Sequence, residues 1–350
     1  MRLGILGLPQ GGKTTLFEIV VSNAPPRAPG ARQDRVGVVR VPDERVDRLS
    51  AMYQPKKTTF ATLEVIDSQA MGQGGSGAKG ADLFAGVRNA DALVLVVRAF
   101  EDPSVPHPKT TVDAARDLAD LEAEILLNDM AIVETRLERI AKQKRLAKTA
   151  DLEREEAVLA RCKEALDREQ PLRELEFDRD EERALRGFQL LSRKPLLVIY
   201  NVASGQAFTA PATRRKGVSS VVLPCADERE VARLPPGERA QFREAYGISE
   251  DGLVLLVRSA YRLLGLISFL TAGEDEVRAW TIQDGETAVD AAGAIHTDLA
   301  QGFVRAVVMS YGQFVEAGSE AKAREKGWQR TEGRDYRVVD GDILHVLHNK

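Results

Sequence analysis

The segment GLPQGGKTT occupies residues 7–15, close to the start of the chain. Gly7, Gly12, Lys13 and Thr14 fit the pattern G-x-x-x-x-G-K-[ST], whose backbone N–H groups surround phosphate groups. A short apolar run at 3–6 precedes the loop, and a helical pattern begins after it at 14–21. A strand, a glycine-rich loop and a helix in this order predict a site for the phosphates of a nucleotide.

Two further features extend this site. The predicted nucleotide-binding residues of the loop are Pro9, Gln10, Gly11, Gly12, Lys13, Thr14 and Thr15. Lys13 would contact the β- and γ-phosphates, and the Thr14 hydroxyl would bind Mg²⁺. Asp67 ends an apolar run at 62–66, the place where P-loop NTPases carry a second Mg²⁺ partner. An aspartate at a strand end is also an ordinary turn or cap residue, but the loop upstream favours the metal role.

The base of the nucleotide is expected at residues 201–204, which read Asn-Val-Ala-Ser after another apolar run. A guanine-specific site carries N-K-x-D, and here Val202 and Ser204 replace its lysine and its aspartate. Losing a charged hydrogen bond to guanine removes about 1.5–3 kcal/mol of preference. We therefore expect Asn201 and Val202 to lie at the base, with ATP or loose specificity favoured over GTP.

Short apolar runs separated by helical segments predict an α/β fold with a parallel sheet. The predicted strands are 3–6, 62–66, 91–97, 195–200 and 218–223. Between 112 and 191 helical spacing takes over, with a break at 149–151 and Asp151 as the expected N-cap of a second helix, which predicts a helical hairpin. A strand at 277–282, a helix at 287–295 capped by Thr287 and a hairpin at 336–347 predict a small α+β domain.

We therefore predict three parts: a nucleotide-binding domain at 1–111 and 192–270, an inserted hairpin at 112–191, and a C-terminal domain at 271–350. The net charge of −4 supplies no global field toward membranes or nucleic acid, and no DNA partner is expected. No apolar run reaches the about 18 residues that span a bilayer. Cys162 and Cys225 form no C-x-x-C pair, which favours a reducing compartment, and the N-terminus does not look like a signal peptide. These features predict a cytoplasmic protein.

Seven segments carry a resemblance to a known family. They are GLPQGGKTTLF at 7–17, VGVVRVPDERVDRL at 36–49, DALVLVVRAFED at 91–102, NVAS at 201–204, LISFLTAGEDEVRAWT at 266–281, AAGAIHTDLAQGFVRA at 291–306 and EGRDYRVVDGDILHV at 332–346. With these the chain resembles the Obg-like ATPases of the YchF type, a branch of the translation-factor GTPases. The resemblance implies a P-loop NTPase domain interrupted by a helical hairpin and followed by a TGS domain of β-grasp, ubiquitin-like fold.

The same resemblance implies slow, Mg²⁺-dependent ATP hydrolysis and association with ribosomes or RNA. It also implies a histidine in place of the usual water-orienting glutamine. Within FEDPSVPHPK at 100–109 the matching residue is His107, which without the family would be an ordinary loop histidine.

Several positions depart from the family where the γ-phosphate is sensed. Ala31 stands for a switch threonine, Ala70 for the glycine of D-x-x-G, and Ser204 for the glutamate of the base motif, while the glycine-rich loop at 72–80 is short. These changes leave the phosphate loop intact and weaken the expectation of a switching cycle. Three hypotheses follow: a slow ATPase that regulates the ribosome or another ribonucleoprotein, a hydrolysis-deficient scaffold that holds a nucleotide, or an RNA-binding adaptor acting through the TGS domain.

Overall fold

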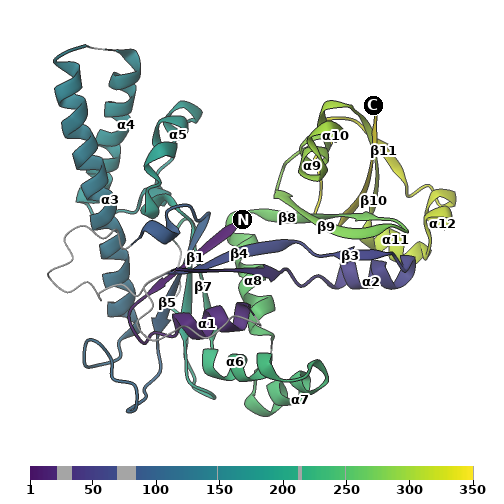
Figure 1. Ribbon diagram of the computed structural model, residues 1–350, viewed down its shortest axis with the longest axis horizontal. Helices are drawn as coiled ribbons and strands as arrows, with labels where there is room; N and C mark the ends of the chain where they lie inside the picture. The colour runs from purple at the N-terminus through teal and green to yellow at the C-terminus, as the bar shows by residue number, and fades with distance from the viewer. Residues whose placement is uncertain (22–33, 69–83, 148, 212–214, 249, 350) are drawn as a thin grey trace. The chain divides into compact units, whose positions relative to one another are not determined.

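The computed structural model describes residues 1–21, 34–68, 84–147, 149–211, 215–248 and 250–349 (Figure 1). Ala31, Ala70 and the loop at 72–80 lie outside these ranges. The described chain divides into two compact units, each built from two segments. The first unit is Met1–Val39 with Glu64–Leu263, and the second is Arg40–Leu63 with Leu264–Lys350.

The first unit contains a six-stranded sheet in the order β2-β4-β1-β5-β6-β7. Its strands are β1 (Arg2–Gly7), β2 (Arg35–Arg40), β4 (Thr62–Asp67), β5 (Ala92–Arg98), β6 (Leu196–Asn201) and β7 (Val218–Leu223). From β4 to β7 all neighbours are parallel. The five predicted apolar strands are thus confirmed, each within a residue or two of its expected bounds. Only the edge strand β2 was not predicted.

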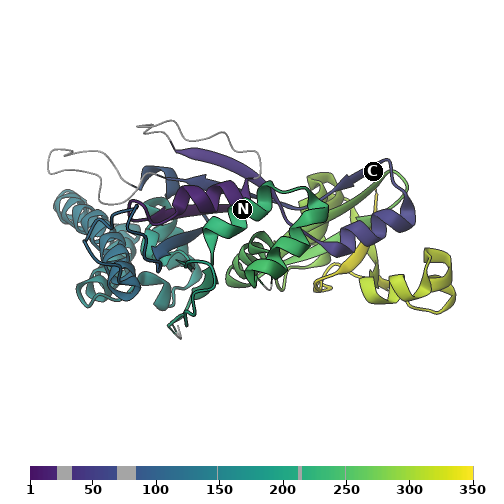
Figure 2. The same cartoon turned by 90° about the horizontal axis from the view of Figure 1, so that it is seen from below.

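Helical elements cover both faces of this sheet, as a parallel sheet requires. On one face, α3 (Ala114–Lys144) and the 3₁₀ turns η1 (Ala85–Val87) and η4 (Leu191–Arg193) pack on buried side chains of the strands. On the other face, α1 (Lys13–Val20) and α6 (Cys225–Arg233) lie side by side (Figure 2). Because the strands are parallel, their carboxyl ends meet at one edge, where the loop after β1 lies.

The helical hairpin consists of α3 and α4 (Ala150–Asp167), which pack together around an apolar core of their own. This confirms the predicted hairpin, although its cap differs. The Thr149 side chain accepts a hydrogen bond from the Leu152 N–H at 3.3 Å, so Thr149 and not Asp151 is the N-cap. The buried Asp129 carboxylate ties α3 to η4 by accepting hydrogen bonds from the Leu191 and Ser192 N–H groups at 3.0 and 2.7 Å.

Besides α6, three further helices and two 3₁₀ turns complete the unit. They are α5 (Arg179–Leu185), α7 (Pro236–Tyr246) and α8 (Gly252–Leu264), with η2 (Leu172–Glu174) and η3 (Arg186–Phe188). Among the residues with described positions, no helix has both the length and the apolar character needed to cross a bilayer.

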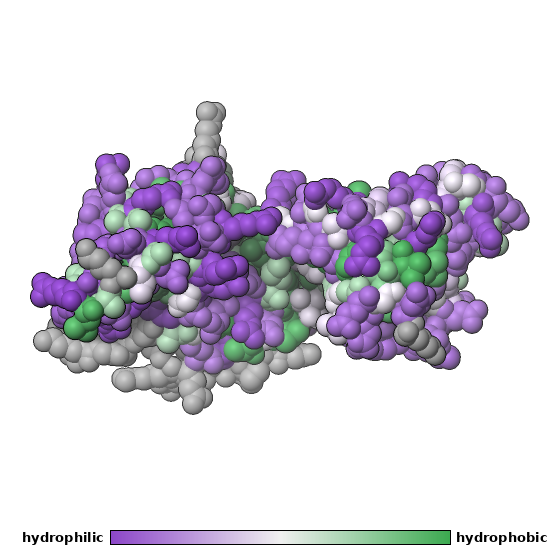
Figure 3. All heavy atoms as spheres, turned by 90° about the horizontal axis from the view of Figure 1, so that it is seen from above, coloured by the Kyte–Doolittle hydropathy of each residue, from purple (hydrophilic) through white to green (hydrophobic). Residues whose placement is uncertain are grey.

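The face drawn in Figure 3 is mostly hydrophilic, with smaller hydrophobic groups between the hydrophilic ones.

The second unit has a mixed sheet in the order β11-β10-β12-β8-β9-β3. Its elements are β3 (Lys57–Thr59), β8 (Leu266–Ala272), β9 (Glu276–Gln283), β10 (Phe303–Ser310), β11 (Arg330–Glu332), β12 (Asp342–His348), α2 (Glu44–Tyr53), α9 (Ala288–Ile295), α10 (Thr297–Gln301), α11 (Tyr311–Ala317) and α12 (Glu320–Glu325). Alanines of α9 pack with Phe269 and Phe303 of the sheet in one core. The expected strand, the expected helix and its Thr287 cap are confirmed, and this mixed sheet with a helix packed on it is the β-grasp arrangement that the resemblance implies.

The hairpin predicted at 336–347 is wrong. Only its second half is a strand, β12, and that strand pairs with β10 and β8. The first half instead bonds to the start of α9: the Tyr336 carbonyl accepts from the Ala288 N–H at 2.8 Å, and the Val338 N–H donates to the Glu286 carbonyl at 3.1 Å. The structure has the predicted turn at Asp340–Gly341. However, the backbone groups of Tyr336 and Val338 before the turn already bond to Ala288 and Glu286, so they cannot pair with β12.

The division into units assigns one segment of the predicted 1–111 stretch to the second unit. Residues 40–63, which the sequence placed in the nucleotide-binding domain, group with the C-terminal residues. The strand β3 adds to the edge of β9 with Lys57 opposite Glu276, and α2 packs on β8 and β9.

Candidate functional site

The loop between β1 and α1 has the backbone geometry that its glycines predict. Gly12, the N-cap of α1, has a φ of 102°, which lies in the left-handed region that favours glycine. A Cβ at Gly12 would also collide with the Asn201 amide. The helix therefore begins directly at Lys13, with its first N–H groups at the mouth of the loop.

Lys13 closes this loop from inside. Its ammonium donates hydrogen bonds to the carbonyls of Gly7 and Leu8 at 3.0 and 2.9 Å, and the residue is 7% exposed. A cation and the N-terminus of an eight-residue helix thus share one short segment. Both attract anions, and together they form a phosphate-binding arrangement.

The loop opens into a pocket of about 530 Å³, which we call the P-loop pocket. Its described lining residues are Gln10, Gly12, Lys13, Thr14, Thr15, Phe100, Glu101, Asp102, Pro103, Val105, Asn201, Val202, Ala203, Ser204, Ala226 and Arg229. Seven predicted nucleotide-binding residues belong to this lining, whereas Pro9 and Gly11 do not. The volume falls in the range of about 300–1,000 Å³ common for small-molecule sites.

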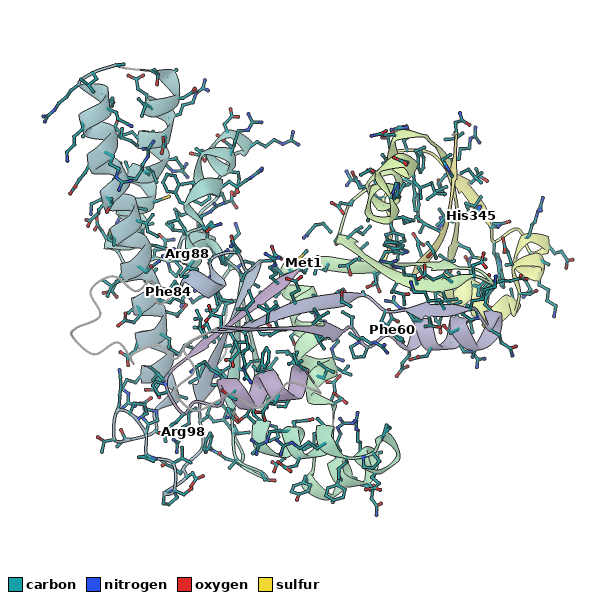
Figure 4. All side chains as sticks on the ribbon, viewed as in Figure 1. Met1, Phe60, Phe84, Arg88, Arg98 and His345 are labelled. Atoms are coloured by element: carbon teal, nitrogen blue, oxygen red, sulfur yellow. The ribbon has the colours of Figure 1, made fainter. Side chains whose placement is uncertain are left out.

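One wall of the pocket is organised by Arg98, a residue outside the motifs that predict the site. The Arg98 guanidinium donates to the Phe100 and Val105 carbonyls at 3.0 and 2.8 Å and stacks 4.4 Å from the Phe100 ring centroid. Figure 4 labels Arg98 at the carboxyl end of β5. Its one sequence signal was a lone charge ending a valine-rich strand, and at 3% exposure it acts as an internal brace for the lining loop.

Asn201 holds the opposite wall together. Its side-chain amide donates to the Gly11 carbonyl at 3.1 Å, and its side-chain carbonyl accepts from the Cys225 N–H at 3.2 Å. The residue is 5% exposed. Asn201 thus joins the glycine loop, the end of β6 and the start of α6, and its polar atoms are engaged within the protein, although it lines the pocket.

His107 lies against α3. Its side chain is 3% exposed, its Nε2 lies 2.8 Å from Oδ2 of Asp117, and its Nδ1 accepts a hydrogen bond from the Lys109 N–H at 3.1 Å. The other Asp117 oxygen accepts from Arg116 at 2.8 Å. His107 is not among the described residues that line the P-loop pocket, so the imidazole would have to leave Asp117 in order to orient water there.

Of the two predicted metal ligands, Thr14 and Asp67, only Thr14 is among the described residues that line the P-loop pocket. The Thr14 hydroxyl suits Mg²⁺. Asp67 is fully buried at the end of β4, where its Oδ2 accepts hydrogen bonds from Nη2 and Nε of Arg35 at 2.6 and 3.1 Å. One oxygen of the Asp67 carboxylate thus already has a charged partner in the protein, and in this arrangement Arg35 neutralises the carboxylate that Mg²⁺ would use. The metal role of Asp67 stays a prediction. Within the described ranges, no group of three or more His, Cys, Asp or Glu side chains could hold a metal ion.

Comparisons with known proteins show which family the chain is similar to. The family model YchF-GTPase_C, described as "Protein of unknown function (DUF933)", matches residues 266–349. The chain is 36% identical over 368 residues to the ribosome-binding ATPase YchF of Bacillus subtilis, covering 100% of this chain and 99% of that protein. It is 35% identical over 362 residues to the protein of that name from Escherichia coli O157:H7, covering 99% of both.

A solved structure, that of the Schizosaccharomyces pombe YchF GTPase, matches with a TM-score of 0.81 at 30% identity, covering 99% of this chain and 97% of that one. The match therefore includes the sheet around the glycine loop, the helical hairpin and the C-terminal sheet. Similarity in sequence and in structure extends over nearly the whole length of the chain, and the chain belongs to the YchF family.

Proposed function

We propose that this protein is a nucleotide-binding P-loop NTPase that hydrolyses ATP slowly and acts at the ribosome in the cytoplasm. The observation that carries the proposal is the glycine loop, in which Lys13 and the start of α1 open into the P-loop pocket. The curated relatives, named ribosome-binding ATPases, support the ribosome as partner and hence the cytoplasm as location.

ATP is the proposed nucleotide because the base side of the pocket lacks the guanine-pairing carboxylate of N-K-x-D. Ser204 occupies that sequence position and lines the pocket, and the Asn201 amide is engaged with Gly11 and Cys225. The guanine base of GTP would have no carboxylate to pair with in this pocket. We therefore expect ATP to bind as well as GTP or better.

Mg²⁺ is proposed to accompany the nucleotide, with Thr14 as its ligand from the protein. When bound, Mg²⁺ would neutralise phosphate charge. The residues themselves supply the rest: the glycine loop and Lys13 hold the phosphates, and Arg98 keeps the 100–105 wall in place. His107 is proposed to orient the attacking water once it separates from Asp117.

The test is to measure the affinity for ATP, GTP and ADP by titration calorimetry, followed by turnover of radiolabelled ATP with and without ribosomes. We expect ATP to bind at least as tightly as GTP and to be hydrolysed slowly. A hundredfold preference for GTP, or about 2.7 kcal/mol, would contradict the base-site argument.

The alternative is a scaffold that holds a nucleotide without hydrolysing it. The contact of His107 with Asp117 favours this alternative, because it turns the proposed water-orienting group toward α3. Tight ATP binding without turnover, both with and without ribosomes, would favour the scaffold over the enzyme.

A further inference from the structure

Arg35 and Asp67 form a buried ion pair beside the phosphate loop. The guanidinium reaches a single carboxylate oxygen through two nitrogens, at 2.6 and 3.1 Å. The Asp67 side chain is fully buried, and that of Arg35 is 15% exposed. Charge-assisted hydrogen bonds of this length are among the stronger ones in proteins.

An aromatic ring holds the arginine in place. The Arg35 guanidinium lies 4.5 Å from the centroid of Phe17 on α1, and Phe17 is buried one turn after Thr14. Asp67 lies opposite Ile5 of β1, two residues before Gly7. The pair therefore contacts the strand that leads into the glycine loop and the helix that follows it, and it is packed from three elements: β2, β4 and α1.

This arrangement places a permanent positive charge on the carboxylate that a P-loop NTPase of the usual kind offers to Mg²⁺. A guanidinium stays protonated at every physiological pH. Two cations that share one buried carboxylate repel each other, and the repulsion is larger in a protein wall than in water. Mg²⁺ at Asp67 would therefore bind against the positive charge of Arg35 for as long as the Arg35 contact is kept.

We propose that Arg35 is a built-in cation of the nucleotide site, which competes with Mg²⁺ for Asp67. Nucleotide binding by this chain then depends only weakly on the metal, and the metal is bound weakly. The inference rests on the proposed nucleotide site. It concerns which cation, Arg35 or Mg²⁺, interacts with the Asp67 carboxylate, and not whether a nucleotide binds.

The first experiment titrates Mn²⁺, as a stand-in for Mg²⁺, into the full-length protein with ADP bound, and detects free Mn²⁺ by electron paramagnetic resonance. Arg35→Met removes the charge with little loss of volume, and Arg35→Gln retains one amide that can donate to Asp67. We expect both variants to bind Mn²⁺ about tenfold more tightly than the wild type, a change of about 1.4 kcal/mol. Arg35→Lys retains the positive charge and should bind Mn²⁺ as the wild type does.

A second measurement uses the fluorescence of a methylanthraniloyl-ADP probe, with Mg²⁺ or with EDTA. The wild type should lose less than about threefold in affinity when the metal is removed, and Arg35→Gln should lose about tenfold or more. If Arg35→Met does not fold, as judged by circular dichroism, Arg35→Gln decides the question by itself.

The matched control is Arg2→Met. Arg2 pairs with Glu64 at 2.6 Å, and these residues lie opposite each other at the other end of the same two strands, β1 and β4. Removing this partly exposed pair should change neither the Mn²⁺ affinity nor the metal dependence of ADP binding.

Equal Mn²⁺ affinity in the wild type and both uncharged variants would overturn the inference. A second result would also overturn it: the uncharged variants lose affinity for ATP but not for ADP, and the loss is the same with and without metal. Arg35 would then contact the γ-phosphate. If the wild type fails to bind the ADP probe under both conditions, the proposed function is wrong instead.

Discussion

At the scale of single residues, Lys13 tests the phosphate loop most directly. Its ammonium now lies on the Gly7 and Leu8 carbonyls, where a phosphate would compete for it. Lys13→Ala should lower ATP affinity by about 10- to 100-fold, because a hydrogen bond to a charged group contributes about 1.5–3 kcal/mol. Calorimetry measures the affinity, and circular dichroism checks the fold.

Lys216→Ala is the control for this prediction. Lys216 is 57% exposed and pairs with Glu176, outside the P-loop pocket, so its loss should leave ATP affinity unchanged. Wild-type ATP affinity in Lys13→Ala would mean that the loop does not hold the phosphates.

His107 and Asp117 make a second prediction at this scale. If His107 orients water, His107→Ala should lower ATP turnover by about 100-fold or more and leave ADP affinity unchanged, since general acid–base groups contribute about 10²–10⁴-fold. Asp117→Asn weakens the contact that holds the imidazole against α3, and should raise turnover. Single-turnover hydrolysis measures both. Loss of turnover in both variants, with lower melting temperatures, would instead show that the pair is structural.

The glycine loop was predictable from sequence because its chemistry lies in nine consecutive residues. Arg98 and Arg35 were not, because each acts through a side chain that folds onto groups distant in sequence or onto a neighbouring loop. Asn201 lines the P-loop pocket, and its role at the base stays a prediction. The sequence reports that an amide ends the apolar run of β6, but not that the Gly11 carbonyl lies 3.1 Å from it.

At the scale of elements, Glu228 links three helices. From α6 its carboxylate accepts a hydrogen bond from the Gly252 N–H at the start of α8 at 3.0 Å, and Arg243 of α7 lies 3.9 Å away. The side chain is almost fully buried. Burial raises the pKa of Glu228 from 4.5 to about 7, because the low-dielectric surroundings disfavour the charged form, although Arg243 acts in the opposite direction.

This pKa predicts a stability that falls with rising pH. Between pH 4.5 and about 7 the folded state binds more protons at Glu228 than the unfolded chain does, so the free energy of unfolding decreases as pH rises through that window. Glu228→Gln should remove this slope and stabilise the protein at pH 8, by on the order of 2 kcal/mol. Urea denaturation at several pH values measures both effects.

Glu230→Gln is the control on the same helix, because its side chain is 61% exposed. It should keep the wild-type pH dependence. An unchanged slope in Glu228→Gln would show that the buried carboxyl titrates no differently in the folded and unfolded states.

Element prediction succeeded where a pattern alone determines the structure. The buried strands β5 and β6 are continuous apolar runs, and the hairpin helices repeat their apolar residues at helical spacing. It failed at 336–347, where a genuine turn follows a segment already bonded to Glu286 and Ala288. A local pattern describes a turn but does not say which strand lies across from it.

At the scale of the whole molecule, the second unit is assembled from two segments that are about 200 residues apart in the sequence. Within it, α2 buries Val46 and Leu49 completely, and Tyr53 stacks on Phe314 with ring centroids 5.5 Å apart. Arg45 donates a hydrogen bond to the Asp340 carboxylate at 2.7 Å. Sequence patterns gave no sign of this, because α2 and β3 look like any amphipathic helix and short strand.

These contacts predict that a fragment of residues 264–350 cannot reach full stability alone. Burying side chains such as Val46 and Leu49 contributes about 1.5–3 kcal/mol each, and that is a large part of the stability of a domain this small. The fragment should give a broad thermal transition and poorly dispersed amide signals in NMR. Joining residues 40–63 to it through a flexible linker should restore a cooperative transition.

The control is the same joined fragment with Tyr53→Ala, which removes the stacking on Phe314 and should lower the melting temperature again. If 264–350 alone melts as cooperatively as the joined fragment, the C-terminal domain is independent, as the sequence boundary at 271 implied. If the joined fragment alone folds, residues 40–63 belong to the C-terminal domain. In that case the strand β2, which begins with Arg35 of the ion pair, is followed directly in the sequence by the segment that the C-terminal domain needs in order to fold.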